Sequence, residues 1–196
     1  HHIEYQQSKN WAPIAGDGEL TNKTLVILGF GGIGSQVAKL GKAFGMRVTG
    51  IRRNPQDDEH ADEVLGLDRF EELLPLTDYL VLSLPDSPQT RDIINADILE
   101  KINSSAMLIN VGRGTAINED DLTDALNDGK IAAAALDTTK VEPLDANSSL
   151  WMAKNCFISA HDSAHSLLSL ERAFELFFQN IKNIKNGDQI VNLYSE

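Results

Sequence analysis

Residues 29–34 of the chain read G-F-G-G-I-G, which is the spacing of a dinucleotide-binding turn. The turn directly follows an apolar run and opens a segment with helical periodicity, the context in which such a turn holds a pyrophosphate. Gly29 would permit the tight turn, Gly31 would let the backbone approach the phosphates, and Gly34 would let the helix pack close to the sheet. The free N–H groups at the start of the helix would then bind the phosphate charge. We therefore expect cofactor contacts from Gly29, Gly31, Gly32, Ile33 and Gly34, with a purely structural turn as the alternative.

Two arginines follow the second apolar run, where the ribose of a dinucleotide would lie. NAD-specific sites place a carboxylate about 20 positions after the glycine turn, but residues 51–54 read I-R-R-N. A carboxylate would repel a 2′-phosphate, whereas an arginine offers paired planar donors to it. Arg52 and Arg53 therefore favour NADPH over NADH, although two solvated arginines that tolerate either cofactor would show the same pattern.

A sheet and its helices must position these groups, and both patterns alternate along the chain. Strand-like apolar runs lie at residues 24–29, 47–51, 79–84, 106–110, 131–137 and 156–159, with a weaker run near Val64. Helical patterns lie at residues 32–44, 70–74, 96–102, 118–128 and 166–184. In the first of these helices Ile33, Val37, Leu40 and Phe44 share one face. Strands that alternate with helices predict an α/β fold with a parallel, doubly wound sheet.

The composition limits the partners and the compartment. The 196 residues carry 17 Lys and Arg against 29 Asp and Glu, a formal net charge of −12, which argues against nucleic acid and against an anionic membrane. No apolar run approaches the length of a membrane span, and the start of the chain does not read as a signal peptide. Cys156 is the one cysteine, so the sequence predicts no disulfide framework and no metal site built on cysteines. We expect a cytoplasmic protein.

Beyond the glycine turn, several motifs resemble one family. The chain reads LVILGFGGIGSQVA, LPDSPQTRDIIN, LINVGRG, AAALDTTKVEPL and SAHDSAH in this order. Over residues 20–193 it therefore resembles the cofactor-binding domain of the D-2-hydroxyacid dehydrogenases, which include glyoxylate, hydroxypyruvate and phosphoglycerate oxidoreductases. The resemblance implies a Rossmann fold and hydride transfer between a nicotinamide cofactor and a small 2-keto or 2-hydroxy acid.

The resemblance also implies a catalytic set. Arg113 in LINVGRG matches the arginine that clamps the substrate carboxylate and polarises the keto oxygen. His161 in SAHDSAH matches the acid/base, with His165 as a nearby competitor, and Glu142 in ALDTTKVEPL matches its acidic partner. These types suit the chemistry, because hydride delivery leaves negative charge on oxygen that a positioned acid must protonate. Histidine titrates near neutrality, a nearby carboxylate favours its charged form, and arginine supplies fixed charge at the developing oxyanion.

Further positions match cofactor contacts of the family. Asp137 matches the residue near the nicotinamide amide. The wall around the adenosine half and the backbone that passes the nicotinamide are matched by Leu84, Pro85, Thr90, Val111 and Gly112. Some positions depart from the pattern: Lys140 stands where the family often has an acid, and Asp162-Ser163 replaces a pair that is usually small or apolar. These departures bear on substrate choice and on rate.

The sequence divides into an N-terminal helical segment and linker (1–19), a dinucleotide-binding domain (20–165), and a C-terminal helix and tail (166–196). Family members carry a second, smaller substrate domain, and we expect this chain to lack it. The apolar stripe of helix 166–184 reads as core or subunit interface, and the family implies a homodimer. Two alternatives stay open. One is a non-enzymatic NAD(P) sensor on the same fold. The other is a methyltransferase with the same glycine turn, although such an enzyme would have an acidic residue for the ribose after the second strand, where Arg52 stands.

Overall fold

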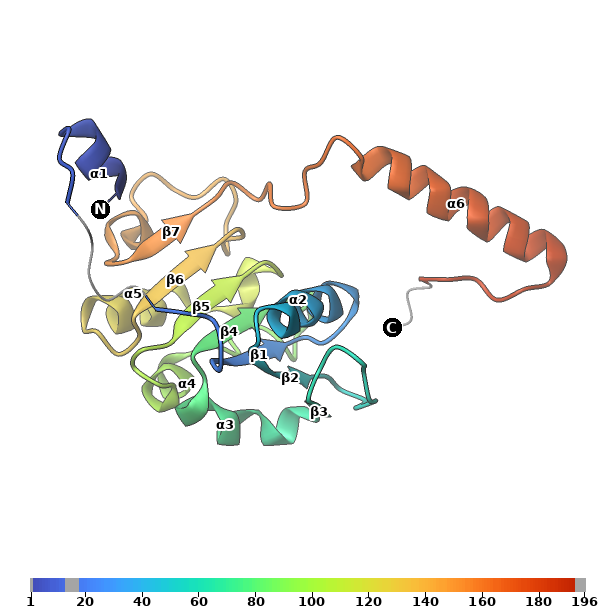
Figure 1. The fold of residues 1–196 in the computed structure, drawn as a ribbon, viewed down its shortest axis with the longest axis horizontal. Helices are drawn as coiled ribbons and strands as arrows, with labels where there is room; N and C mark the ends of the chain where they lie inside the picture. Colours follow the sequence, from blue (N-terminus) through green and yellow to red (C-terminus); the bar gives the residue numbers. More distant parts are fainter. Residues whose placement is uncertain (1, 13–17, 193–196) are drawn as a thin grey trace. The chain divides into compact units, whose positions relative to one another are not determined.

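A computed structural model describes residues 2–12 and 18–192 of the chain. The chain divides into two compact units, His1–Ile158 and Ser159–Glu196, and each is described by itself. The first unit holds the sheet, and the second holds one long helix (Figure 1).

The described residues form a seven-stranded sheet in the order β3-β2-β1-β4-β5-β6-β7. Each of the six pairings is parallel, which confirms the predicted doubly wound fold. The strands are β1 (Thr24–Leu28), β2 (Arg47–Ile51), β3 (Glu63–Leu65), β4 (Tyr79–Leu82), β5 (Met107–Asn110), β6 (Ala133–Leu136) and β7 (Cys156–Ile158). After β3 the chain crosses back over the sheet to β4, so the strand order reverses between β1 and β4. Ligands of open α/β sheets bind at such a reversal, beyond the carboxyl ends of the strands.

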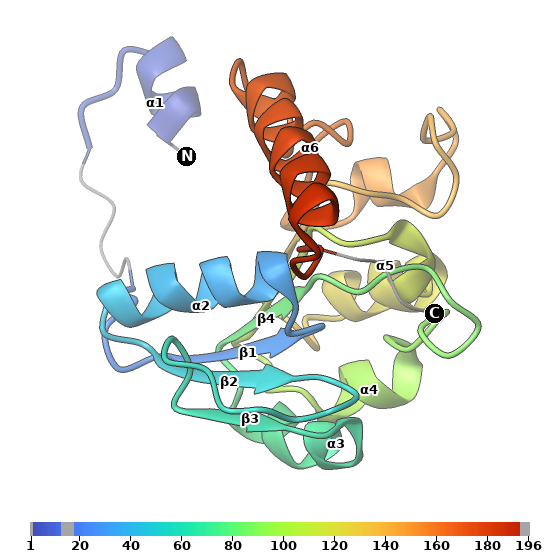
Figure 2. The same cartoon turned by 90° about the vertical axis from the view of Figure 1, so that its right-hand side faces the viewer.

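Helices cover both faces of this sheet (Figures 1 and 2). The helices of the first unit are α1 (His2–Gln7), α2 (Gly32–Ala43), α3 (Phe70–Leu73), α4 (Ala96–Lys101) and α5 (Glu119–Asn127). Successive side chains of a strand point to opposite faces, and the two hydrophobic clusters follow this alternation. Leu25 and Ile27 of β1 pack with Ala38 of α2, whereas Val26 and Leu28 belong to the cluster that contains α3, α4 and α5.

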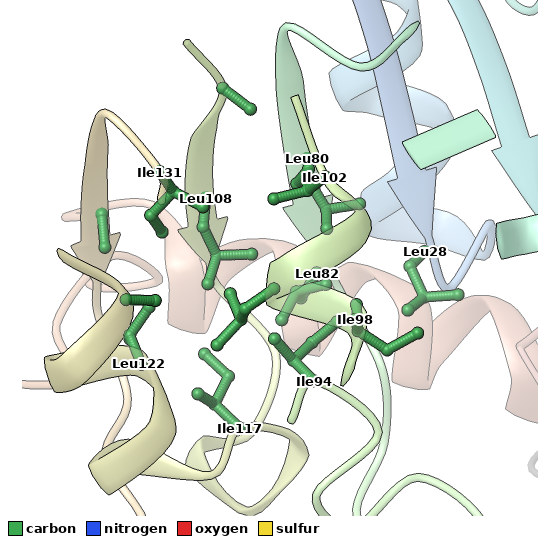
Figure 3. Packing of buried hydrophobic residues seen from close by; sticks show 14 of the residues in the cluster. Leu28, Leu80, Leu82, Ile94, Ile98, Ile102, Leu108, Ile117, Leu122 and Ile131 are labelled. Carbon is green, nitrogen blue, oxygen red and sulfur yellow. The ribbon is translucent and has the colours of Figure 1, made fainter. Parts of the chain in front are cut away.

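The larger cluster fills the space between the sheet and helices α4 and α5 (Figure 3). Leu80, Leu82 and Leu108 come from the central strands and are almost fully buried. Ile94 precedes α4 and Ile117 precedes α5. The two residues form a parallel β-bridge, and both side chains belong to the same cluster. This core fixes the carboxyl ends of β4 and β5, from which candidate site residues extend.

Helix α2 packs on the sheet through its small residues. Gly34, Ala38 and Gly41 are buried, whereas the larger side chains of Ile33 and Leu40 are more than half exposed. A Cβ on Gly41 would lie 2.6 Å from Leu25 Cδ2, so the helix axis can approach the sheet this closely only over glycine. Of the apolar face expected from periodicity, Ile33, Leu40 and Phe44 are exposed, whereas Val37 packs against the cluster on this side of the sheet.

The second unit contains α6 (Ser169–Asn186), which ends at Gly187 with φ +76°. The Asn183 side chain donates to Gln189 O (2.8 Å) and accepts from Gln179 Nε2 (2.8 Å), which ties the end of the helix to the segment after it. Much of the apolar stripe predicted for this helix is exposed in this chain, including Phe174 and Phe177. No helix in the described part of the chain is long and apolar enough to cross a bilayer.

Candidate cofactor and substrate site

The glycine turn leaves β1 at the strand-order reversal. Gly29 has φ +101°, and a Cβ there would lie 2.7 Å from the carbonyl atoms of Ser83. The N–H groups of Gly29 and Phe30 donate to Ile51 O (3.0 and 2.8 Å), so the turn is bound to the end of β2. A Cβ on Gly34 would lie 2.8 Å from Gly29 O, which explains the third glycine. Gly29 combines a left-handed φ with close backbone contact, and only glycine satisfies both.

The first turn of α2 is open to solvent, as a phosphate site requires. Gly31 and Gly32 are exposed, and a Cβ on either would meet nothing within 4 Å. Gly31 is the N-cap and makes no side-chain cap hydrogen bond, so backbone N–H groups of the first turn are left to a ligand or to water. A pyrophosphate fits this turn by geometry and by charge.

A second support for this turn, the hydroxyl of Ser83, could not be predicted from the sequence. Its Oγ donates to Gly29 O at 2.7 Å, across 54 positions of the chain. Ser35, one residue beyond the turn, contacts Asp58 (Oγ to Oδ2, 3.1 Å), and this bond ties the loop after β2 to the start of α2. Both contacts join residues far apart in sequence, so no local pattern reveals them.

Arg52 and Arg53 follow β2 on the same edge of the sheet. The Arg52 N–H donates to Leu65 O (3.0 Å), which fixes its backbone against β3, and its side chain is half-buried while Arg53 is exposed. Among the described residues neither guanidinium makes a hydrogen bond or ion pair. Both side chains are therefore available to an anion at the end of β2.

The loop after β4 carries Leu84, Pro85 and Thr90 in one compact turn. Thr90 Oγ1 donates to Pro85 O (2.7 Å) and accepts from the N–H of Ser87 (3.0 Å), so this side chain sets the turn. Leu84 packs against the larger hydrophobic cluster. The Thr90 hydroxyl therefore has a structural role within the loop, and its contact with a cofactor stays a prediction.

Asp86 anchors this loop to the next one. It accepts two hydrogen bonds from the Arg91 guanidinium (3.1 and 3.2 Å) and one from Thr115 Oγ1 (2.9 Å). These bonds, led by that from Arg91, hold the pKa of the Asp86 carboxyl below its ordinary value, and the nearby charge of Arg113 acts in the same direction. Sequence reasoning missed this cluster, because its members are spread over 29 positions.

Arg113 lies in the loop after β5, between two glycines that contact backbone on both sides. A Cβ on Gly112 would lie 2.7 Å from Leu84 N, and a Cβ on Gly114 would overlap the carbonyl group of Thr139. The loop is therefore wedged between the loops that follow β4 and β6. The Arg113 side chain is exposed, and its Nη1 donates to Gly112 O (2.9 Å). Val111, which follows β5 directly and precedes Gly112, is half-buried.

The loop after β6 brings two predicted residues to the same edge. Asp137 is buried, with 6% of its surface exposed, directly beyond the strand. Glu142 is exposed, and its Oε1 accepts from the N–H of Thr139 (3.1 Å). Lys140 contacts Asp92 (Nζ to Oδ1, 3.0 Å), so this departure from the family pattern ties the loop to the one after β4.

His161 belongs to the second unit, where it is exposed and has φ +53°. The first unit thus gathers the glycine turn, Arg52, Arg113 and Asp137 at one edge of its sheet. Within the described ranges no group of three or more His, Cys, Asp or Glu could hold a metal ion.

The sequence model for the D-isomer specific 2-hydroxyacid dehydrogenases, NAD binding domain, matches residues 1–163. The chain belongs to this family. This membership agrees with the geometry, because the glycine turn, the open start of α2 and the arginine loop all lie where a dinucleotide crosses such a sheet. The NAD(P)-binding fold and the family named from the sequence motifs are thereby confirmed.

Curated relatives extend the comparison. The chain is 34% identical to a hydroxypyruvate reductase of Blautia hydrogenotrophica over 88% of its own length and 53% of the relative. It is 39% identical to the glyoxylate reductase/hydroxypyruvate reductase of Homo sapiens over 78% of the chain and 47% of the relative. The chain thus spans about half the length of these relatives.

Solved structures show the same likeness. A D-isomer specific 2-hydroxyacid dehydrogenase family protein from Aeromonas salmonicida superposes with a TM-score of 0.88 at 35% identity, covering 99% of this chain and 62% of that one. An NADPH-dependent glyoxylate/hydroxypyruvate reductase from Sinorhizobium meliloti, solved with NADP and sulfate, gives a TM-score of 0.86 at 27% identity over the same shares.

Proposed function

We propose that the chain provides the NADPH site and the catalytic residues for the reduction of a small 2-keto acid to its D-2-hydroxy acid. The observation that carries the proposal is the wedged arginine loop. Arg113 extends from between two glycines that touch the backbone after β4 and β6, at the edge where the glycine turn opens. A cation held there can bind the carboxylate of an acid that lies beside a nicotinamide.

Each residue has a defined role in the proposed reaction. Bound NADPH supplies the hydride. The Arg113 guanidinium binds the substrate carboxylate and stabilises the charge that develops on the keto oxygen. His161 donates the proton to that oxygen, and Glu142 favours the charged form of the imidazole. Asp137, buried at the end of β6, accepts from the nicotinamide amide.

The substrate class is proposed from chemistry and from relatives. One arginine and one histidine suffice for a small acid, because they account for the carboxylate and the keto oxygen. Relatives are named for glyoxylate and for hydroxypyruvate, and both are small 2-keto acids. Glyoxylate and hydroxypyruvate are therefore the substrates to try first. The homodimer expected from the family stays a prediction, which light scattering checks.

NADPH is proposed as the preferred cofactor because of the two arginines after β2. Neither side chain is engaged within the described residues, and both lie next to the strand whose end receives the adenosine ribose. Structures of two relatives contain NADP, from Rhizobium etli and from Sinorhizobium meliloti. A 2′-phosphate would find paired donors here, and the NADH ribose would find no carboxylate among residues 51–54.

Replacing His161 tests the reaction. In the full-length protein, His161→Gln should lower kcat for glyoxylate reduction by roughly 10²–10⁴-fold, the usual contribution of a general acid. The dissociation constant of NADPH, measured by fluorescence titration, should stay unchanged. His165→Gln is the matched control and should retain turnover. Full activity of His161→Gln would overturn the assignment, and tight NADPH binding without turnover by the unmodified protein would favour the non-enzymatic sensor.

Replacing Arg52 tests the cofactor preference. Arg52→Asp should shift the ratio of NADPH to NADH affinity by at least about tenfold toward NADH, since it exchanges a charge-assisted phosphate contact for repulsion. Arg47→Asp, an exposed arginine at the opposite end of β2, makes the same charge change away from the site. An unchanged ratio in Arg52→Asp contradicts the NADPH proposal.

A further inference from the structure

The last residue of β5, Asn110, is a polar side chain with no exposed surface. The reaction proposed above gives it no task, and it is three residues from Arg113. Burying an amide costs free energy unless each of its polar atoms is hydrogen-bonded, so its partners indicate its role.

Both partners of this amide lie in the loop that carries Arg113. Asn110 Oδ1 accepts from the N–H of Gly112 (3.0 Å), and Nδ2 donates to Arg113 O (3.1 Å). The side chain thus bridges the loop at its base. The Asn110 backbone is itself fixed, because its carbonyl oxygen accepts from the N–H of Asp137 (3.0 Å) at the end of β6.

The bridge reaches the guanidinium through one residue, Gly112. Gly112 gives its N–H to Asn110, and its carbonyl oxygen accepts from Arg113 Nη1 (2.9 Å). Rotating the backbone at Gly112 would therefore break the bond to Asn110 and move the resting position of the arginine head. Gly112 has no side chain of its own to hold the loop, and a Cβ there would strike Leu84 N.

We propose that Asn110 is a positioning residue for substrate binding: its buried amide sets the backbone from which Arg113 presents its guanidinium to the substrate carboxylate. This inference rests on the proposed role of Arg113. Asparagine suits the task because one end must accept and the other must donate. Leucine has a similar volume and can do neither, and aspartate can only accept.

The test uses the full-length protein with saturating NADPH and a varied concentration of glyoxylate. Asn110→Leu should lower kcat/KM by roughly tenfold or more, mainly through a higher KM, because a misplaced arginine loses ground-state binding of the carboxylate. Thr77→Val is the matched control for stability. Thr77 is also fully buried, and its Oγ1 donates to Leu73 O (2.8 Å) before β4. The Thr77→Val variant should have a lower free energy of unfolding, while its kcat/KM should stay within about twofold of that of the unmodified protein.

A double-mutant cycle separates positioning from general damage. In an Arg113→Lys background, which already lacks the paired donors, Asn110→Leu should cost less than about twofold in kcat/KM. Equal losses in both backgrounds would overturn the inference. If Asn110→Leu does not fold, Asn110→Asp keeps the volume and the acceptor and should show the same dependence on Arg113.

Two readouts distinguish failure of this inference from failure of the proposed function. If Arg113→Lys leaves kcat/KM unchanged, the proposed role of Arg113 fails and the inference fails with it. If Arg113→Lys impairs reduction and Asn110→Leu does not, only the inference fails. Calorimetric binding of oxamate, a 2-keto acid analogue, to the NADPH-loaded protein gives the same comparison without turnover. Its affinity should fall in both single variants.

Discussion

At the scale of single residues, the candidate site depends on backbone contacts that exclude side chains. Gly29 meets Ser83, Gly112 meets Leu84, and Gly114 meets Thr139, so loops from neighbouring strands touch without any side chain between them. The charged residues of the site extend from these contacts. Rigid loops of this kind hold an arginine in place before the substrate arrives, which lowers the entropy cost of binding.

Gly114→Ala tests the closest of these contacts. The new Cβ would overlap the Thr139 carbonyl group, so the loop must shift, and overpacking of this kind costs about 1–3 kcal/mol of unfolding free energy. The same shift moves Arg113, so kcat/KM should fall as well. Denaturant unfolding and steady-state rates measure the two effects. Gly18→Ala is the matched control, since nothing lies within 4 Å of a Cβ there, and a Gly114→Ala protein as stable and active as this control contradicts the contact.

Cys156 permits a test that depends on pH. Burial raises the pKa of its thiol to about 11. At pH 8 the thiolate should therefore be roughly 200-fold scarcer in the folded protein than in the unfolded chain, whose thiol titrates near 8.5. Iodoacetamide should modify Cys156 correspondingly slowly, and urea should restore an ordinary rate.

The sign of the linkage is opposite to that of a salt-bridged carboxylate. The fold favours the protonated thiol, so its contribution to stability is complete below the unfolded pKa. It is lost as the pH rises from about 8.5 toward the folded value. Fast native alkylation at pH 8 would show that the thiol is not buried as described.

At the scale of elements, periodicity predicted where helices and strands lie better than which face is buried. The strand runs and helix patterns reappear within a few residues, because alternating apolar segments need only local spacing to be recognised. Hydrophobic periodicity did not predict the buried face of α2. Gly34, Ala38 and Gly41 are buried there because the helix lies close to the sheet, which requires small residues rather than hydrophobic ones. Contacts such as Ser83 to Gly29 join the ends of neighbouring strands that are 54 positions apart in sequence, so they leave no periodic signal.

Two substitutions on α2 distinguish the faces. Ala38→Leu adds volume where the helix meets the sheet and should cost about 1–3 kcal/mol of unfolding free energy. Leu40→Ala removes a side chain that is 62% exposed and should cost less than about 0.5 kcal/mol. Denaturant titration of both variants measures the difference. A larger loss of unfolding free energy in Leu40→Ala than in Ala38→Leu would show that the face expected from periodicity is the buried one.

At the scale of the whole chain, the residues proposed for the cofactor and for the proton lie in different units. The glycine turn, the arginines after β2, the Arg113 loop and Asp137 all belong to His1–Ile158, whereas His161 belongs to the second unit. The parallel sheet explains the first group, because its strands end at one edge. His161 follows the last strand and belongs to a unit that contains no strand of the sheet. The strand pattern in the sequence therefore could not predict its position.

This division predicts that cofactor binding and turnover can be separated by truncation. A chain that ends after Ile158 keeps every residue proposed to contact NADPH and should bind it with a dissociation constant within roughly threefold of the longer protein. Turnover should be lost, because His161 is removed. Fluorescence titration measures the binding, and a cooperative thermal transition confirms that the truncated chain is folded. The same truncation with Arg52→Asp should bind NADPH more weakly, which shows that the retained site is the one after β2. A folded truncated chain that no longer binds NADPH would place part of the cofactor site in the second unit.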